Sequence, residues 1–95
     1  MNVGSYVGNG ADNRSVTGVG FQPGYLITRP EATASNMNSA HKTASSGAST
    51  DLTMRFYASG NNDNEIQALQ SGGFQVGSAD KVNQSGKTFY WMAFK

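Results

Sequence analysis

Residues Gly72–Lys95 read GGFQVGSADKVNQSGKTFYWMAFK and end in the most apolar run of the chain, Thr88–Phe94. Aromatic enrichment, a glycine just before the run and its short length favour a strand over a helix. Successive side chains of a strand point to opposite faces. The two faces are Phe89, Trp91 and Ala93 on one side, and Tyr90, Met92 and Phe94 on the other. Because both are apolar, we expect this strand to be covered on both sides, or to face a core on one side and a partner on the other.

Further short strands are expected along the chain, separated by glycine-rich turns. They are Asn2–Val7, Arg14–Thr17, Tyr25–Arg29, Asp51–Ala58 and Phe74–Gly77. The Asn-Gly pair within the turn 8–13 supplies the positive φ of a tight hairpin, so Arg14–Thr17 is interpreted as the return strand of Asn2–Val7. Glu65–Gln70 fits either one helical turn or a short strand. Short strands at regular spacing predict an all-β fold, a small antiparallel sandwich or a jelly-roll-like barrel.

Single apolar residues and prolines refine this prediction. Pro23 excludes a central strand from the loop 18–24, and Pro30 is expected to end the strand before it. Phe21 is expected to be a buried plug in that loop. Val16, Phe74 and Val76 are expected to point inward, and Val82 to be the apolar anchor of the connection 78–86.

The segment Glu31–Thr50, EATASNMNSAHKTASSGAST, differs from the rest of the chain. It has one Met and no large aliphatic or aromatic residue, so it cannot bury enough apolar surface to order itself unaided. We expect a long polar loop or extended arm, either a mobile surface loop or a binding loop, in a single β-domain of residues 1–95. In an oligomer such an arm would lie across a neighbouring subunit.

The composition excludes several classes of protein. Charged residues are 14% of the 95 residues and the formal net charge is +1, with Lys and Arg spread singly, so no basic stripe for nucleic acid is present. No apolar run approaches the ~20 residues of a membrane span. The first residues, MNVGSYVGNG, lack a signal-peptide pattern, so export by the general secretory route is not expected. There are no cysteines to form disulfides, and a small domain without them often gains stability from a partner subunit.

Residues that could carry catalysis or bind a metal are sparse. His41 is the single histidine and has no acidic or nucleophilic neighbour in sequence, so we expect a surface histidine. The carboxylates lie in or beside predicted turns, where solvated or capping roles are expected. They are Asp12, Glu31, Asp51, Asp63, Glu65 and Asp80. We therefore expect a protein that is not an enzyme and that needs no metal or cofactor.

The aromatic residues permit two interpretations. If exposed, Tyr6, Tyr25, Tyr57, Tyr90 and Trp91 could stack on sugar rings, whereas in a sandwich this small aromatic residues more often lie in the core or a subunit interface. We expect Trp91 to be largely buried in one of those two places. The candidate assembly residues are Tyr90, Trp91, Met92, Phe94, Met37 and Tyr57.

Several short motifs together resemble a repeat domain of tailed-phage and prophage structural proteins. They are the Gly8-Asn9-Gly10 turn, the Gly20-Phe21-Gln22-Pro23 plug, the Gly73-Phe74-Gln75-Val76-Gly77 strand, and the Asn83-Gln84-Ser85-Gly86 turn before Thr88–Phe94. The polar segment stands where members of that family often carry Trp or His beside charged residues. The resemblance covers both ends of the chain and implies one complete antiparallel β-domain of a virion, in a tail fibre, spike or capsid decoration, with no catalytic residues.

The sequence thus favours a virion structural protein, assembled in the host cytoplasm, that forms a homo-oligomer and contacts other virion proteins. Apolar sheet faces and edges would carry the assembly. The alternative is a carbohydrate- or host-surface-binding β-module that uses exposed aromatic residues. Neither interpretation involves nucleic acid or membrane insertion.

Overall fold

The strand β8 (Thr88–Phe94) lies inside the larger sheet, where it hydrogen-bonds to β1 (Asn2–Val7) on one side and β3 (Tyr25–Pro30) on the other. A computed structural model of the chain describes residues 1–31, 39–49, 51, 53–55 and 64–95. The remaining elements are β2 (Arg14–Thr17), β4 (Ala40–Thr43), the 3₁₀ helix η1 (Ala44–Ser46), β5 (Met54–Arg55), β6 (Ile66–Gln70), β7 (Gly73–Val76) and α1 (Asp80–Asn83).

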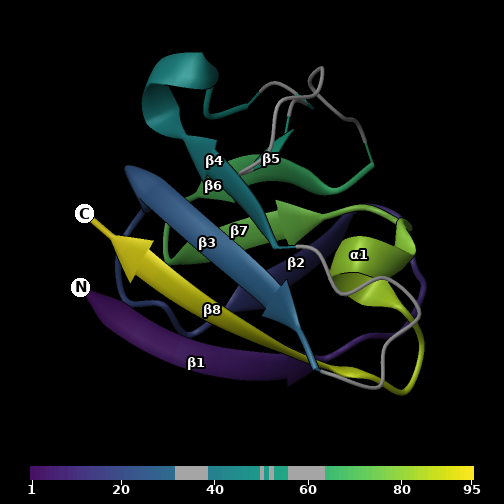
Figure 1. Ribbon diagram of the computed structural model, residues 1–95. Helices are drawn as coiled ribbons and strands as arrows, with labels where there is room; N and C mark the ends of the chain where they lie inside the picture. The colour runs from purple at the N-terminus through teal and green to yellow at the C-terminus, as the bar shows by residue number, and fades with distance from the viewer. Residues whose placement is uncertain (32–38, 50, 52, 56–63) are drawn as a thin grey trace.

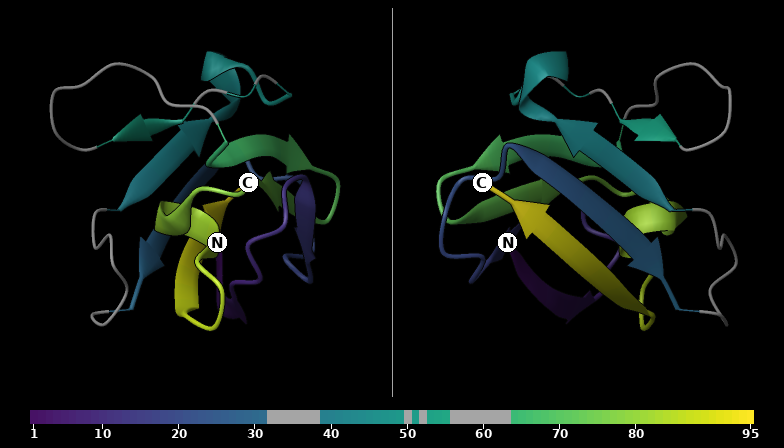
Figure 2. Two further views of the ribbon diagram at one scale, coloured as in Figure 1. Left: turned by 90° about the vertical axis from the view of Figure 1, so that its right-hand side faces the viewer. Right: turned by 60° about the vertical axis from the view of Figure 1, so that its left-hand side comes forward.

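Two antiparallel sheets face each other (Figure 1). Sheet A has the strand order β1-β8-β3-β4-β5, and sheet B has the order β2-β7-β6. The short helix α1 lies at one end of the pair of sheets (Figure 2). The predicted fold class, a small antiparallel sandwich, is confirmed.

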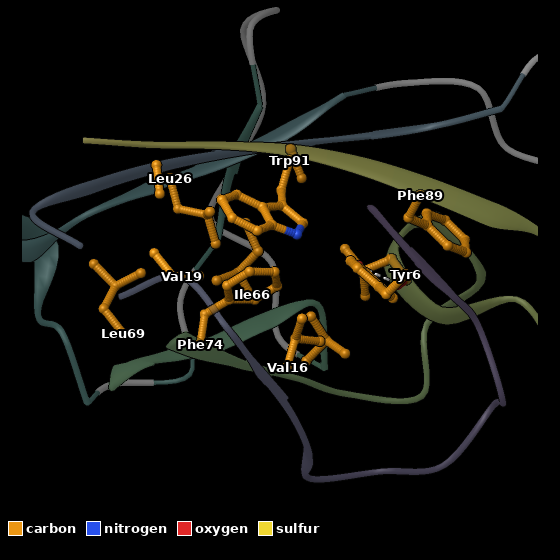
Figure 3. Close-up of a cluster of buried hydrophobic side chains, with 13 residues drawn as sticks. Tyr6, Val16, Val19, Leu26, Ile66, Leu69, Phe74, Phe89 and Trp91 are labelled. Carbon is orange, nitrogen blue, oxygen red and sulfur yellow. Dashed lines mark hydrogen bonds between the residues drawn. The ribbon is translucent and has the colours of Figure 1, made fainter. Parts of the chain in front are cut away.

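The core fills the space between the two sheets (Figure 3). Trp91 hangs from β8 toward Phe74 of β7, with ring centroids 6.1 Å apart in a T-shaped arrangement. Tyr6 stacks on Phe89 at 5.4 Å, and its hydroxyl donates a 2.6 Å hydrogen bond to the carbonyl of Val82. The predicted inward positions are confirmed, since Phe74, Val76 and Val82 are fully buried and Val16 is 7% exposed. Trp91 is 6% exposed and lies in the core. This confirms the prediction that it is buried, and it selects the core over a subunit interface.

The predicted hairpin between β1 and β2 is wrong. β2 pairs with β7 in sheet B, whereas β1 pairs with β8 in sheet A. The connecting loop crosses from one sheet to the other, and Asn83 of α1 holds it. The Asn83 side chain accepts a hydrogen bond from the backbone of Asn9 and donates one to the carbonyl of Ala11, at 3.0 and 2.7 Å. The loop is therefore fixed by a residue far along the chain.

The prediction of a polar arm over Glu31–Thr50 is wrong where the structure describes it. Ala40–Thr43 forms β4, which pairs with β3 inside sheet A, and η1 follows directly. Ala40 and Lys42 are fully buried. Residues 32–38, Met37 among them, and residue 50 lie outside the described residues. Backbone pairing in a large sheet thus orders a segment that lacks large apolar side chains.

Several smaller expectations have clear outcomes. Residues 66–70 form a strand, which resolves the choice left open for Glu65–Gln70, and part of the connection 78–86 is the helix α1, which was not predicted. Of the strand expected at Asp51–Ala58, β5 spans Met54–Arg55, and residues 52 and 56–63 lie outside the described part. Phe21 is half-buried and packs against the core. Pro30 is the last residue of β3.

Candidate functional site

Alternation along β1, β3 and β8 places apolar side chains on the surface of sheet A that faces away from the core. We call this surface the outer face of sheet A. Its most exposed large apolar residues are Val3 (57%), Val7 (56%), Tyr90 (47%), Met92 (45%) and Phe94 (37%). Half-buried Tyr25 and Ile27 of β3 point to the same side. The face that is normally polar in a half-solvated antiparallel sheet is therefore apolar here.

The strand register arranges these residues in rows across the sheet. Met92 lies opposite Val3 on one side and Ile27 on the other, which gives an apolar row over three strands. In the next row, Tyr90 lies between Ser5 and Arg29. Directly opposed side chains on one face of a sheet contact each other. The outer face is therefore a continuous surface, built from side chains of three adjacent strands that contact one another.

A shallow groove of about 440 Å³ runs along these rows. It lies where the short side chain of Ser5 stands among larger neighbours on the outer face. Most of its walls are apolar. The lining residues are Val3, Gly4, Ser5, Ile27, Arg29, Ser39, Tyr90, Trp91 and Met92. The core residue Trp91 also contributes to the lining of the groove.

The exposed apolar area can be compared with known interfaces. With full side-chain areas of roughly 150–250 Å², the five exposed residues together present on the order of 450 Å² to solvent. That equals the largest apolar patch of a typical monomer, and such patches are often functional. A standard interface buries about 800 Å² per partner. The patch with its half-buried neighbours and polar rim is of a size to form one such interface.

Charged groups stand at the rim of the outer face. Lys87 Nζ and Glu31 Oε1 are 3.9 Å apart beside the start of β8, and this half-buried surface ion pair contributes little to stability. Arg29 is exposed at the end of β3, next to Tyr90 in the register. Among the residues that the structure describes, none at the centre of the face, around Met92, carries a charge. Its attraction for a partner is therefore hydrophobic, and charged residues surround it.

A tyrosine–histidine pair lies at the other end of the face. The Tyr25 hydroxyl and His41 Nδ1 are 2.9 Å apart, and their rings meet edge to face at 5.6 Å. Tyr25 also contacts Phe94, with ring centroids 6.0 Å apart. Partial burial raises the pKa of Tyr25. His41 is thus half-buried and hydrogen-bonded, which differs from the expected free surface histidine.

The structure brings three of the six sequence candidates together. Tyr90, Met92 and Phe94 lie side by side on the outer face, whereas Trp91 points into the core. Met37 and Tyr57 lie outside the described residues. Val3, Val7 and Ile27 were not named as candidates from the sequence, and Tyr25 was considered only for stacking on sugar rings. The alternation of NVGSYV places Val3 and Val7 on one face of the strand. That pattern alone does not predict that the strand pairs with β8.

Some ionisable side chains lie inside rather than in solvated turns. Glu65 is 2% exposed, so its expected place in a solvated turn is wrong, and Lys42 and Lys81 are equally buried. Burial lowers the pKa of Lys42, and the charge of Asp51 opposes that shift. Within the part of the chain that the structure describes, no three His, Asp or Glu side chains cluster as metal ligands. No helix in those same ranges is long and apolar enough to cross a membrane.

The fold and the surface define a two-sheet antiparallel β-domain that presents one apolar sheet face outward. The chain belongs to the family described as Domain of unknown function (DUF7483), which it matches over residues 1–95. No curated protein and no solved structure matches the chain.

Proposed function

We propose that this chain is a non-enzymatic structural protein that works by assembly, and that the outer face of sheet A packs on a neighbouring copy of the same chain. The observation that carries the proposal is the exposed apolar group on β1 and β8, centred on Met92. Covering that group removes apolar area from water, which is favourable by roughly 25 cal/mol per Å². Assembly is the function that this surface supports best.

A second copy fits the surface because the centre of the face is uncharged. Two identical faces can therefore meet without like-charge repulsion, which would oppose contact between charged identical surfaces. An isologous contact of this kind forms the commonest oligomers. The low charge content of the chain, 14%, also gives little protection against association.

We further propose that the assembly belongs to a virion, where the chain would contact other virion proteins in a tail fibre, spike or capsid decoration. The support is the resemblance of the Gly-Asn-Gly, Gly-Phe-Gln-Pro and Asn-Gln-Ser-Gly motifs to a tailed-phage repeat domain. The apolar outer face agrees with that setting, since subunits of a virion are covered by neighbours.

The test is the mass in solution of the chain and of two matched variants. Met92→Glu puts a charge at the centre of the outer face, and Thr17→Glu puts the same charge on exposed β2 of sheet B. We expect the wild type and Thr17→Glu to exceed the 10.0 kDa of one chain. Met92→Glu should have a lower mass at an unchanged melting temperature. A wild type that stays monomeric at high concentration, or a Met92→Glu variant with the wild-type mass, would contradict the proposal.

A carbohydrate-binding function is the second candidate, and the exposed ring of Tyr90 beside the groove favours it. Sugar sites combine such a ring with several convergent polar groups. Here the polar residues along the groove are Ser5, Arg29 and Ser39. A glycan array separates the two functions. Retention of a glycan by the wild type, lost in Tyr90→Ala without any change in mass, would favour the carbohydrate-binding function.

A further inference from the structure

β1 is an edge strand, and no other strand among the described residues pairs with its outer edge. It pairs with β8 alone and is the terminal strand of sheet A, as Figure 1 shows. The backbone N–H of Gly8, which continues β1, donates to the carbonyl of Lys87 at 2.8 Å. Backbone groups alternate between the two sides of a strand. It follows that Asn2, Gly4 and Tyr6 bond to β8, whereas the N–H and C=O groups of Val3, Ser5 and Val7 point to the open edge.

Two of those outward groups are satisfied within the chain. The Val3 N–H donates to Oδ1 of Asn2 at 3.0 Å. The Val7 carbonyl accepts a hydrogen bond from Nη1 of Arg14. Among the described residues, no other group bonds to this edge. The groups left over are the N–H and C=O of Ser5, the N–H of Val7 and the C=O of Val3.

This edge has little of the usual protection against strand pairing, because the one described charge that reaches it, the Arg14 guanidinium, bonds the Val7 carbonyl at its end. Proteins block open edges with charges, prolines, bulges or very short strands. In sheet B, β2 is short and begins with Arg14, and β6 has an irregular register between Ile66 and Ala68. In contrast, Asn2–Val7 has six residues, no charge and no proline. β1 is therefore the edge on which another strand can be added.

We propose that β1 of a second copy of this chain pairs antiparallel with β1, with Ser5 opposite Ser5 on a two-fold axis. In that register the two Ser5 residues exchange both of their backbone hydrogen bonds. The Val7 N–H of each copy then meets the Val3 C=O of the other. The Val3 N–H and Val7 C=O, which face each other in the same row, keep their bonds to the side chains of Asn2 and Arg14. The unbonded groups thus form a self-complementary set.

The pairing also extends the apolar surface. Val3 of one copy lies opposite Val7 of the other, on the same side as Tyr90 and Met92. Sheet A becomes continuous across the two copies, and the two outer faces form one larger face. The edge bonds through backbone groups and the face packs through side chains. Amide exchange at Ser5 therefore tests the pairing separately from the proposed function, whereas a charge at position 5, whose side chain lies on the outer face, acts on both contacts.

Charge pairs at position 5 test the register. Ser5→Lys alone and Ser5→Glu alone put like charges directly opposite each other, so each should raise the dissociation constant of the β1-paired dimer several-fold. An equimolar mixture of the two variants should restore association to at least the wild-type level. Thr17→Lys and Thr17→Glu are the controls and should change nothing, alone or mixed. Unchanged association of Ser5→Lys, or a mixture no stronger than either variant alone, overturns the pairing even if Met92→Glu lowers the mass.

Amide exchange in the wild type tests the same hydrogen bonds without substitution. The Ser5 and Val7 N–H groups should exchange fast in dilute solution and slowly at high concentration. The Tyr6 N–H, which faces β8, should be protected at both concentrations and serves as the internal control. A Ser5 N–H that exchanges equally fast at every concentration overturns the proposal.

Discussion

Gly4 lies directly opposite Trp91 in the β1–β8 pair, and the indole covers it. A Cβ atom at this position would stand 2.5 Å from Cζ2 and 2.7 Å from Cε2 of Trp91. No side chain other than hydrogen fits there without moving the indole. Gly4 therefore has a packing role in the core.

We expect Gly4→Ala to lower the free energy of unfolding by about 1–3 kcal/mol, the cost of overpacking a filled core. The denaturant midpoint gives the measurement. Ser5→Ala, one residue along on the exposed side, should stay within about 0.5 kcal/mol of the wild type. Equal stability of Gly4→Ala and Ser5→Ala would show that the indole has room to move.

The ionisation of Tyr6 makes the free energy of unfolding fall at high pH. Its burial raises the pKa of the hydroxyl well above the ordinary value, although the nearby Arg14 guanidinium opposes the shift. In the unfolded chain a tyrosine ionises near pH ~10. The folded state keeps the proton longer than the unfolded state does, so stability is full below that pH and falls as the pH rises above it.

Tyr6→Phe should lower the free energy of unfolding at pH 7 by about 1–3 kcal/mol, because the Val82 carbonyl loses its donor. The variant should also lose less stability than the wild type between about pH 9 and 11. Tyr25, whose pKa is raised as well, is present in both proteins and leaves a smaller common slope. Melting curves across this range give the comparison, and parallel declines would contradict the role of Tyr6.

At the scale of elements, β8 could be predicted from the sequence because its alternation separates two sets of apolar residues, one for each face. Alternation in Thr88–Phe94 places Trp91 inward and Met92 outward. The sequence also predicted β1 and β2 as strands, but it did not predict that they belong to different sheets. An Asn-Gly turn gives a local backbone conformation and does not specify the partner strand. That choice depends on Asn83, which is distant in the sequence and anchors the loop.

β4 could not be predicted, because its sequence AHKT has no apolar alternation. Hydrogen bonds to β3 order it, and a lysine at its centre is buried, against the usual preference of that residue. The outer face was predicted in part. Its row of Val3, Met92 and Ile27 depends on the register of three strands, which composition and spacing do not fix.

If β4 is part of the fold, a charge on its buried side should be costly. Ala40→Asp buries an unpaired carboxylate at a position with no solvent exposure, and we expect a loss of about 3 kcal/mol or more. Ala44→Asp, just beyond the strand and exposed, is the matched control and should be nearly neutral. Thermal melts compare the two, and equal melting temperatures would mean that 40–43 behaves as the solvated arm that composition suggested.

At the scale of the whole molecule, two surfaces of sheet A are proposed to make contacts with other copies. The outer face carries exposed apolar side chains, and the β1 edge carries unbonded backbone groups. Both lack charge at their centres, so neither contact should weaken much with added salt. Two isologous contacts on one chain generate assemblies larger than a dimer. Such growth is what the proposed role in a virion would require.

Oxidation of Met92 by peroxide tests the central claim, burial of the outer face on assembly, most directly. Met1, 74% exposed and away from the centre of the face, is the internal reference for Met92, 45% exposed in the single chain. Thioether oxidation follows access to the sulfur. At high concentration Met92 should oxidise several-fold more slowly than Met1, and dilution should remove most of that difference. A ratio of the two rates that stays constant over the whole dilution series would contradict the claim that a second copy covers the outer face.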